Sequence, residues 1–301
     1  MYDLIVVGGG PAGLTATIYA IRKRLNVFMI SRDLGGKTNY HLSLPWIEDY
    51  QVVRGLEVVN KFRNELEYLD FARHMDTVEK VDRDGMSFIV TCKDGEKFVS
   101  KAVLLASGTR QVRLNVPGEK EYTMRGLCYS ALSYAPLFID KRAVVIGRDE
   151  LALRAAGELA TVAQHVTLIT EGNGELKSPL GQKLVVAPNV TILQKYEVLE
   201  VKGDEYARQV IVKDPKGDVY DIHADGTFIE IALAANTRMV EGLVSLDEKG
   251  RIIVDCANRT NIPGVFAAGD VTNSYAEQVL IAIGEGAKAA LSAYDYLLPT
   301  L

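Results

Sequence analysis

The chain is poor in cysteine and in long apolar runs. Cys92, Cys128 and Cys256 are the three cysteines among 301 residues, and their wide spacing provides neither a disulfide framework nor a CxxC pair for zinc or redox chemistry. No apolar run is long enough to cross a bilayer. The net charge of -5 gives no reason to expect nucleic acid or an acidic membrane as a partner.

Other signals are missing as well. The amino terminus shows no basic segment, long apolar stretch and cleavage site in sequence, so we expect a cytoplasmic protein. The histidines show no metal-ligand spacing, and we expect no metal site; they are His41, His74, His165 and His223. A hydrophobic fraction of 48% remains, which is ordinary for a soluble enzyme whose length suits two domains.

Short apolar runs alternate with helix-length amphipathic stretches. The expected strands are Leu4–Val7, Val27–Ile30, Val103–Leu105, Ala143–Ile146 and Val166–Ile169. This rhythm predicts an α/β protein with parallel sheets, and hairpins are expected at 88–98 and 210–222. The strand–turn–helix start near Leu4 recurs near Ala143. We therefore predict two Rossmann-like, three-layer nucleotide-binding domains, the second inserted into the first.

Turn-rich stretches indicate where the chain passes between these domains. They are Val116-Pro117-Gly118-Glu119 and Ala235-Asn236-Thr237-Arg238. The predicted first domain takes residues 1–115 and 242–301, and the inserted domain takes 116–241.

A dinucleotide-binding turn follows the first strand. Its sequence is Gly8-Gly9-Gly10-Pro11-Ala12-Gly13, with a helix predicted through Arg22. In this GxGxxG motif Gly8 permits the tight turn, Gly10 lets the backbone approach a pyrophosphate, and Gly13 lets helix and strand pack closely. The helix amino terminus faces the phosphates.

Two later strands also end in small residues, which lets their backbones touch a ligand. They are Val103–Arg110, with Ala106-Ser107-Gly108, and Gly264–Val271, with Gly269-Asp270. With Gly35-Gly36-Lys37 and the Pro117-Gly118-Glu119 crossing, the order of these motifs resembles the low-molecular-weight thioredoxin reductase family of FAD flavoproteins over almost the whole chain.

The resemblance implies FAD as cofactor, a homodimer and a set of flavin contacts. Asp270 is expected to accept hydrogen bonds from the ribityl hydroxyls, Gln278 and Val279 to reach the isoalloxazine edge, and Val78 to touch the adenine side. Ser31 stands where many dinucleotide sites carry an acid, and the family often has a small polar residue there. The expected FAD-binding residues are Gly8, Gly10, Pro11, Ala12, Gly13, Ser31, Gly35, Gly36, Lys37, Val78, Ala106, Ser107, Gly108, Gly269, Asp270, Gln278 and Val279.

The second dinucleotide turn departs from the family pattern. The family's GxGxxA for NADPH appears here as Gly147-Arg148-Asp149-Glu150-Leu151-Ala152, so Asp149 brings a side chain and a negative charge to an anion site. Where the family places a basic cluster for the 2′-phosphate, this chain has Glu171, an acid that suits a ribose 2′-hydroxyl. We expect no effective NADPH binding. Weak NADH binding and an empty site both remain open.

The family's dithiol is replaced. Its CxxC falls on Ser130-Ala131-Leu132-Ser133, and serine hydroxyls do not perform thiol–disulfide exchange. The catalytic residues are therefore unknown, and reduction of thioredoxin by a dithiol mechanism is not expected. Cys128 is either a packing residue or a lone redox thiol. Tyr129 and Tyr134 either pack or stack on a second aromatic ligand.

Three functional hypotheses follow. The favoured one is a thioredoxin reductase-like FAD oxidoreductase that exchanges electrons with a ferredoxin-type carrier, a quinone, oxygen or a second aromatic cofactor. The basic run Arg22-Lys23-Arg24 is either a docking patch for an acidic carrier or a favourable charge placement at a helix end. The alternatives are an NADH- or NADPH-dependent ferredoxin or flavin reductase and a non-catalytic, flavin-based redox sensor.

Overall fold

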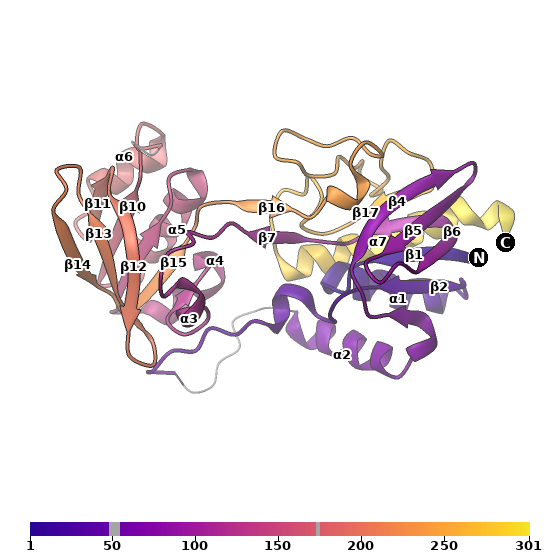
Figure 1. The fold of residues 1–301 in the computed structure, drawn as a ribbon, viewed down its shortest axis with the longest axis horizontal. Helices are drawn as coiled ribbons and strands as arrows, with labels where there is room; N and C mark the ends of the chain where they lie inside the picture. The colour runs from indigo at the N-terminus through magenta and orange to yellow at the C-terminus, as the bar shows by residue number, and fades with distance from the viewer. Residues whose placement is uncertain (48–54, 173–174) are drawn as a thin grey trace. The chain divides into compact units, whose positions relative to one another are not determined.

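The chain folds into two compact units. The computed structural model describes residues 1–47, 55–172 and 175–301 (Figure 1). The described residues of Met1–Asn39, Val53–Arg110 and Ala234–Leu301 form the first unit, and those of Tyr40–Val52 and Gln111–Leu233 form the second. The predicted α/β class with parallel sheets is confirmed. The predicted domain limits stay a prediction about function, because the units are defined by contacts alone.

The first unit is built on one mixed sheet. Among the described residues its strand order is β3-β2-β1-β6-β5-β4, and β17 also pairs with β6. Strands β3, β2, β1, β6 and β17 are parallel, while β4 and β5 add antiparallel neighbours. The strands are β1 (Tyr2–Val7), β2 (Val27–Ile30), β3 (Arg73–His74), β4 (Val78–Asp84), β5 (Ser87–Cys92), β6 (Lys97–Leu105) and β17 (Val265–Ala267).

Strand β1 is covered on both faces, which explains its continuous apolar sequence. Leu4 and Val6 lie in one core cluster with residues of the helices, whereas Ile5 and Val7 lie in another with residues of β4, β5 and β17. The helices of this unit are α1 (Pro11–Arg22), α2 (Leu56–Glu67) and α7 (Val279–Leu297), with short 3-10 turns at Gly36–Asn39, Asp70–Ala72, Arg238–Val240 and Leu298–Thr300.

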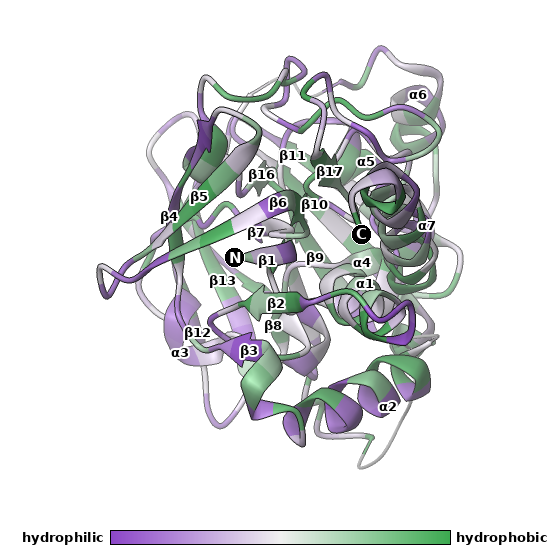
Figure 2. Cartoon of the chain, turned by 90° about the vertical axis from the view of Figure 1, so that its right-hand side faces the viewer, coloured by the Kyte–Doolittle hydropathy of each residue, from purple (hydrophilic) through white to green (hydrophobic). Residues whose placement is uncertain are grey.

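Two helices meet beside the glycine turn. Helix α7 packs on α1 so closely that a Cβ on Gly286 would lie 2.2 Å from the carbonyl oxygen of Ala12. Helix α2 is amphipathic, with hydrophilic residues along one side and hydrophobic residues along the other (Figure 2). Its buried residues Val59, Phe62 and Leu66 follow helical spacing. Within the described ranges, no helix combines the length and apolar character that a membrane span needs.

The second unit has a parallel sheet and an antiparallel sheet. In the described part of the chain the parallel sheet has the order β11-β10-β9-β15-β8, and the antiparallel sheet has the order β12-β13-β14. The strands are β8 (Leu127–Cys128), β9 (Arg142–Ile146), β10 (His165–Thr170), β11 (Val190–Gln194), β12 (Glu197–Gly203), β13 (Ala207–Lys213), β14 (Val219–His223) and β15 (Gly226–Ile229). The helices are α3 (Glu119–Tyr122), α4 (Ala131–Tyr134), α5 (Glu150–Ala160) and α6 (Pro179–Val185), with a 3-10 turn at Ala135–Phe138.

The chain changes units at two paired segments, β7 (Thr109–Gln111) and β16 (Leu233–Ala235). The units change after Arg110 and after Leu233, slightly before the predicted crossing points. The sequence also assigned all of residues 1–115 to the first domain, yet the described part of Tyr40–Val52 groups with the second unit. The reason is burial: Leu42 and Leu44 are at most 2% exposed within the core of that unit.

Candidate functional site

The predicted dinucleotide turn lies between β1 and α1. Gly8 has φ of +109°, and a Cβ there would lie 2.3 Å from the carbonyl oxygen of Ala106. A Cβ on Gly13 would lie 1.8 Å from the oxygen of Gly8. A Cβ on Gly10 would meet nothing within 4 Å among the described atoms. The turn is thus packed against the sheet at its two ends and bare in the middle, as a backbone that receives a ligand must be.

The end of α1 suits an anion. The helix begins with Pro11 after Gly10, no side chain caps its first turn, and no acidic residue lies in that turn. Its macrodipole is therefore not offset at the end that faces the bare turn. The chain's own residues fit the pyrophosphate of a dinucleotide at this position.

The Gly35-Gly36 turn lies against the same glycine turn. Gly35 donates its N–H to the oxygen of Gly9 at 2.7 Å, and a Cβ on Gly36 would lie 3.1 Å from the Cα of Gly10. Both residues have positive φ, +107° and +57°. Two segments that the sequence predicted separately are therefore brought together.

The strand that ends at Leu105 continues into Ala106-Ser107-Gly108. Ala106 donates to the oxygen of Val7 at 2.8 Å, which holds this segment beside β1. Ser107 and Asn236 exchange two hydrogen bonds, from Ser107 Oγ to the oxygen of Asn236 at 2.7 Å and from Asn236 Nδ2 to the oxygen of Ser107 at 2.9 Å. The Ser107 hydroxyl is thereby engaged within the protein.

Asp270 and Lys37 form the charged part of the site. Lys37 Nζ lies 2.7 Å from Asp270 Oδ2 and 3.1 Å from Glu277 Oε2, and it donates to Thr109 Oγ1 at 2.7 Å. Thr109 in turn donates to Glu277 Oε2 at 3.2 Å. Residues from four distant segments thus converge on one ammonium group, and we call them the Lys37 cluster.

Charge and burial compete in the Lys37 cluster. Burial is the largest influence on Glu277 and raises the pKa of its carboxyl; Lys37 opposes this shift, and the negative charge of Asp270 adds to it. Burial would lower the pKa of Lys37, but the carboxylates of Asp270 and Glu277 together raise it above its ordinary value. The cluster holds two carboxyl groups against one ammonium, so Glu277 is the group placed to take up a proton.

The start of α7 carries the predicted isoalloxazine contacts. Gln278 precedes the helix in an extended conformation, and its exposed side chain does not cap it. Val279 is the first helical residue and is half-buried. Gly269, with φ of +77°, donates its N–H to Glu285 Oε2 at 2.8 Å, which ties the end of β17 to the same helix.

The predicted adenosine contacts lie on the other side of the first unit's sheet. Ser31 follows β2; its hydroxyl donates to the oxygen of Asp33 at 2.7 Å, and its N–H donates to the oxygen of His74 at 3.1 Å. The side chain of Val78 is 6% exposed, so it packs in the core. The backbone of β4 at this position pairs with Cys92.

The second dinucleotide turn has the same framework and a different centre. A Cβ on Gly147 would lie 2.2 Å from the oxygen of Glu230, so this glycine is required by packing, as Gly8 is. Asp149 occupies the residue before α5, yet its side chain makes no cap hydrogen bond and is 57% exposed. Glu171 follows β10 and is exposed. The two acids lie where the sequence placed them.

The two serines at the dithiol position are neighbours. Ser130 Oγ donates to Ser133 Oγ at 3.0 Å, and Ser130 directly precedes α4. Cys128 is 1% exposed, and burial raises the pKa of its thiol. An inert packing thiol is what this environment favours. The buried Glu230 accepts from the N–H of Ala131 at 2.6 Å, a contact that the sequence did not indicate.

The two tyrosines near this position are engaged in different cores. Tyr134 is 6% exposed and its hydroxyl donates to the oxygen of Tyr40 at 3.2 Å, whereas Tyr129 donates to Glu119 Oε1 at 2.9 Å. Burial raises the pKa of each phenol to about 12. Stacking of a second aromatic ligand on these rings stays a prediction.

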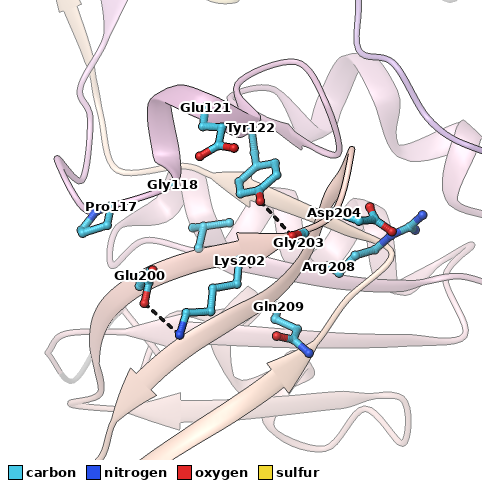
Figure 3. Close-up of a pocket in the computed structure, with 11 residues that line it drawn as sticks. Pro117, Gly118, Glu121, Tyr122, Glu200, Lys202, Gly203, Asp204, Arg208 and Gln209 are labelled. Atoms are coloured by element: carbon cyan, nitrogen blue, oxygen red, sulfur yellow. Dashed lines mark hydrogen bonds and ion pairs between the residues drawn. The ribbon is translucent and has the colours of Figure 1, made fainter.

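A cleft in the second unit lies away from all predicted site residues. It runs between α3 and β12, and Figure 3 shows Tyr122 donating to the oxygen of Gly203 at 3.0 Å and Lys202 paired with Glu200 at 3.1 Å. Its charges of both signs pair with one another, as Arg208 does with Asp204 at 3.5 Å. We assign it no function.

The fold and the first glycine turn define a flavoprotein-type oxidoreductase with two nucleotide-binding units. The chain matches the family description "Pyridine nucleotide-disulphide oxidoreductase" over residues 2–286, and it belongs to that family. A thioredoxin reductase from Streptococcus pyogenes MGAS5005 is 31% identical, with a TM-score of 0.88 and 99% of both chains covered. The predicted resemblance and an FAD-dependent oxidoreductase are thereby confirmed.

Two curated relatives are longer proteins. One belongs to the alkyl hydroperoxide reductase of Pseudomonas aeruginosa and is 35% identical over 99% of this chain and 59% of its own length. The other, a protein named NADH dehydrogenase from Bacillus subtilis, is 33% identical over 99% of this chain and 59% of its own length. The chain thus spans about three fifths of these relatives.

The sequence missed partners rather than positions. Thr109 directly follows the predicted Gly108, and Glu277 directly precedes the predicted Gln278, so adjacency was the one available signal for both. A second cluster has no such signal: His74, Asp76, Cys92 and Asp94 come together, although histidine spacing predicted no metal site.

Proposed function

We propose that this chain is a thioredoxin reductase-type FAD oxidoreductase that exchanges electrons without a redox-active disulfide and without NADPH as its donor. The observation that carries the proposal is the pair of hydroxyls on Ser130 and Ser133, 3.0 Å apart at the position aligned with the dithiol. A serine hydroxyl does not form the thiolate that exchange requires. Electrons must therefore enter and leave the flavin by another route.

The first unit supports FAD. The turn from Gly8 to Gly13 is suited to the pyrophosphate, Asp270 to the ribityl chain, and Gln278 and Val279 to the isoalloxazine edge. FAD, when bound, supplies the two-electron redox chemistry. The chain's own part is to bind and orient it, and Glu277 in the Lys37 cluster is placed to hold a proton nearby.

The electron partner we favour is an acidic protein carrier of the ferredoxin type. The basic run at the end of α1 supports this only in part, because Arg22 pairs with Glu65 at 3.2 Å and Lys23 lies 4.9 Å from the centre of the Tyr294 ring. Their charges remain at the surface, where they steer association at low ionic strength. A quinone, oxygen and a second aromatic cofactor are the other routes, and a homodimer is the expected assembly.

NADH-driven flavin reduction is the second candidate. Two observations favour it: the acid Glu171 after β10 suits a ribose 2′-hydroxyl, and the Bacillus subtilis relative is named NADH dehydrogenase. The exposed Asp149 at the turn opposes it by repelling the pyrophosphate.

An anaerobic absorbance titration of the purified FAD-loaded protein separates these candidates. NADH, NADPH and a chemically reduced ferredoxin are added in separate titrations, with dithionite as the positive control. We expect dithionite and ferredoxin to bleach the flavin band, and the two nucleotides to leave it unchanged. Stoichiometric and fast bleaching by NADH makes the second candidate correct, and bleaching by NADPH contradicts the proposal.

A further inference from the structure

Four metal-ligand side chains meet at one edge of the first unit. His74 lies on β3, Asp76 follows it, Cys92 ends β5, and Asp94 lies in the turn between β5 and β6. Their ligand atoms all lie within 4.8 Å of one another. His74 Nε2 is 2.8 Å from Asp94 Oδ2, so one pair is already in contact. These residues are separated by up to 20 positions in sequence.

The Cys92 thiol points into this group from the core. It is 1% exposed, and among the described residues its sulfur has no hydrogen-bond partner. The burial pattern of β5 alternates, and Cys92 is on the inward-facing side. The cluster is therefore more than a set of surface acids, because a buried soft donor closes it from below.

The donor set matches the chemistry of zinc. Zn²⁺ binds imidazole nitrogen and carboxylate oxygen at about 2.0–2.2 Å and thiolate sulfur at about 2.3 Å, in a tetrahedron. Neighbouring ligand atoms in such a tetrahedron are separated by roughly 3.3–3.8 Å, so the group needs to contract by about 1 Å. Asp94 is exposed and Asp76 half-buried, which leaves their side chains room to rotate.

We propose that His74, Asp76, Cys92 and Asp94 form a tetrahedral zinc site. The imidazole is neutral and the other three ligands are anionic, so the bound site carries a net charge of minus one. One proton leaves the Cys92 thiol when the metal binds, and the His74 imidazole binds through Nε2. The metal ties β3 to β5 and to the turn after β5.

The location suggests what the metal stabilises. Ser31 donates its N–H to the oxygen of His74 at 3.1 Å, and Cys92 pairs with Val78 across β4 and β5. Ser31 and Val78 are the predicted adenosine contacts, so zinc braces the strands that hold this end of FAD. This consequence rests on the proposed function, whereas the metal site itself does not.

Metal binding to the untagged, FAD-loaded protein tests the site. After treatment with a chelator, the protein is dialysed against a range of Zn²⁺ concentrations and its metal content is measured. We expect saturation at one zinc per chain. In parallel, Co²⁺ is expected to give the visible bands of a tetrahedral site at longer wavelengths than oxidised flavin absorbs.

Three variants locate the metal. Cys92→Ala is expected to weaken zinc binding by about 100-fold or more, because loss of a direct ligand costs at least as much as loss of an outer-sphere partner. Asp94→Asn changes an exposed residue, preserves folding and weakens binding as well. Cys256→Ser alters the exposed cysteine outside the cluster and leaves binding unchanged.

Absence of saturable binding in the unsubstituted chain overturns the proposal, as does zinc binding that is unchanged in both Cys92→Ala and Asp94→Asn. Flavin content and reduction by dithionite and by reduced ferredoxin are measured on the same samples. These readings report on the proposed function separately, since an electron route through FAD can fail while zinc still binds, and the reverse.

Discussion

The two glycine turns of this chain share a framework and differ at its centre. Gly8 and Gly147 are both pressed against the neighbouring strand, where a Cβ would lie 2.3 and 2.2 Å from a carbonyl oxygen. The middle position is a bare glycine at Gly10 and an exposed carboxylate at Asp149. The residues needed for folding are present in both turns, whereas the residue that admits a phosphate is present in one. Packing and ligand binding are thus separable demands on the same motif.

Exchanging the central residue should abolish the difference, and the largest effect is expected in the first unit. Gly10→Asp places a carboxylate about 4 Å from the pyrophosphate, which costs about 4 kcal/mol at an intermediate dielectric, or about a 1000-fold loss of FAD affinity. The flavin content of the purified protein measures this. Gly10→Ala is the matched control and keeps FAD, because its φ of -72° suits alanine and its Cβ position is open. Equal flavin content in both variants would contradict the assignment.

The reciprocal change in the second unit should have a smaller effect. Asp149 is 57% exposed, so water screens its charge and the repulsion of a phosphate is about 1 kcal/mol. Asp149→Gly is therefore expected to raise NADH affinity by about five- to tenfold. Titration of the variant, with Asp149→Asn to separate charge from size, gives the affinity. If neither variant binds NADH more tightly, features other than Asp149 exclude the nucleotide.

Two further substitutions test the dithiol position. The hydroxyls of Ser130 and Ser133 are close enough that Ser130→Cys with Ser133→Cys should form a disulfide after a small side-chain adjustment. Titration of thiols in denaturant is expected to show three free thiols after mild oxidation and two more after reduction. Ser130→Cys alone, as the control, should show four in both states. Five free thiols in the oxidised double variant would mean that α4 holds the two positions apart.

The smallest effect is expected in the Lys37 cluster. The pKa of Glu277 is raised, chiefly by burial, so the folded state prefers its protonated form and this contribution to stability is lost as pH rises through the folded pKa. Glu277→Gln removes that pH dependence. The melting temperature of the variant relative to the unsubstituted protein should rise by a few degrees between pH 4 and pH 8. A constant difference across this range would show that Glu277 does not titrate there.

Much of the fold could be predicted, because its signals are local. The strand at Val27–Ile30 was predicted with its observed bounds, and both hairpins formed at the expected turns. Tyr40–Val52 was placed in the wrong unit. Its few apolar residues carry no periodic signal, and only the completed core shows where Leu42 and Leu44 are buried.

The sequence by itself determined the two glycine turns, the missing cysteine pair and the acids at the second turn, since each depends on residue types at short spacing. Only the tertiary structure decided which distant side chains meet. Lys37 reaches Asp270 and Glu277 because β17 pairs with β6 beside β1, so segments more than 200 residues apart end at one edge of the sheet. His74 and Cys92 meet for a similar reason, through the pairing of separate strands in that sheet. Strand order is a non-local property, and short-range spacing does not encode it.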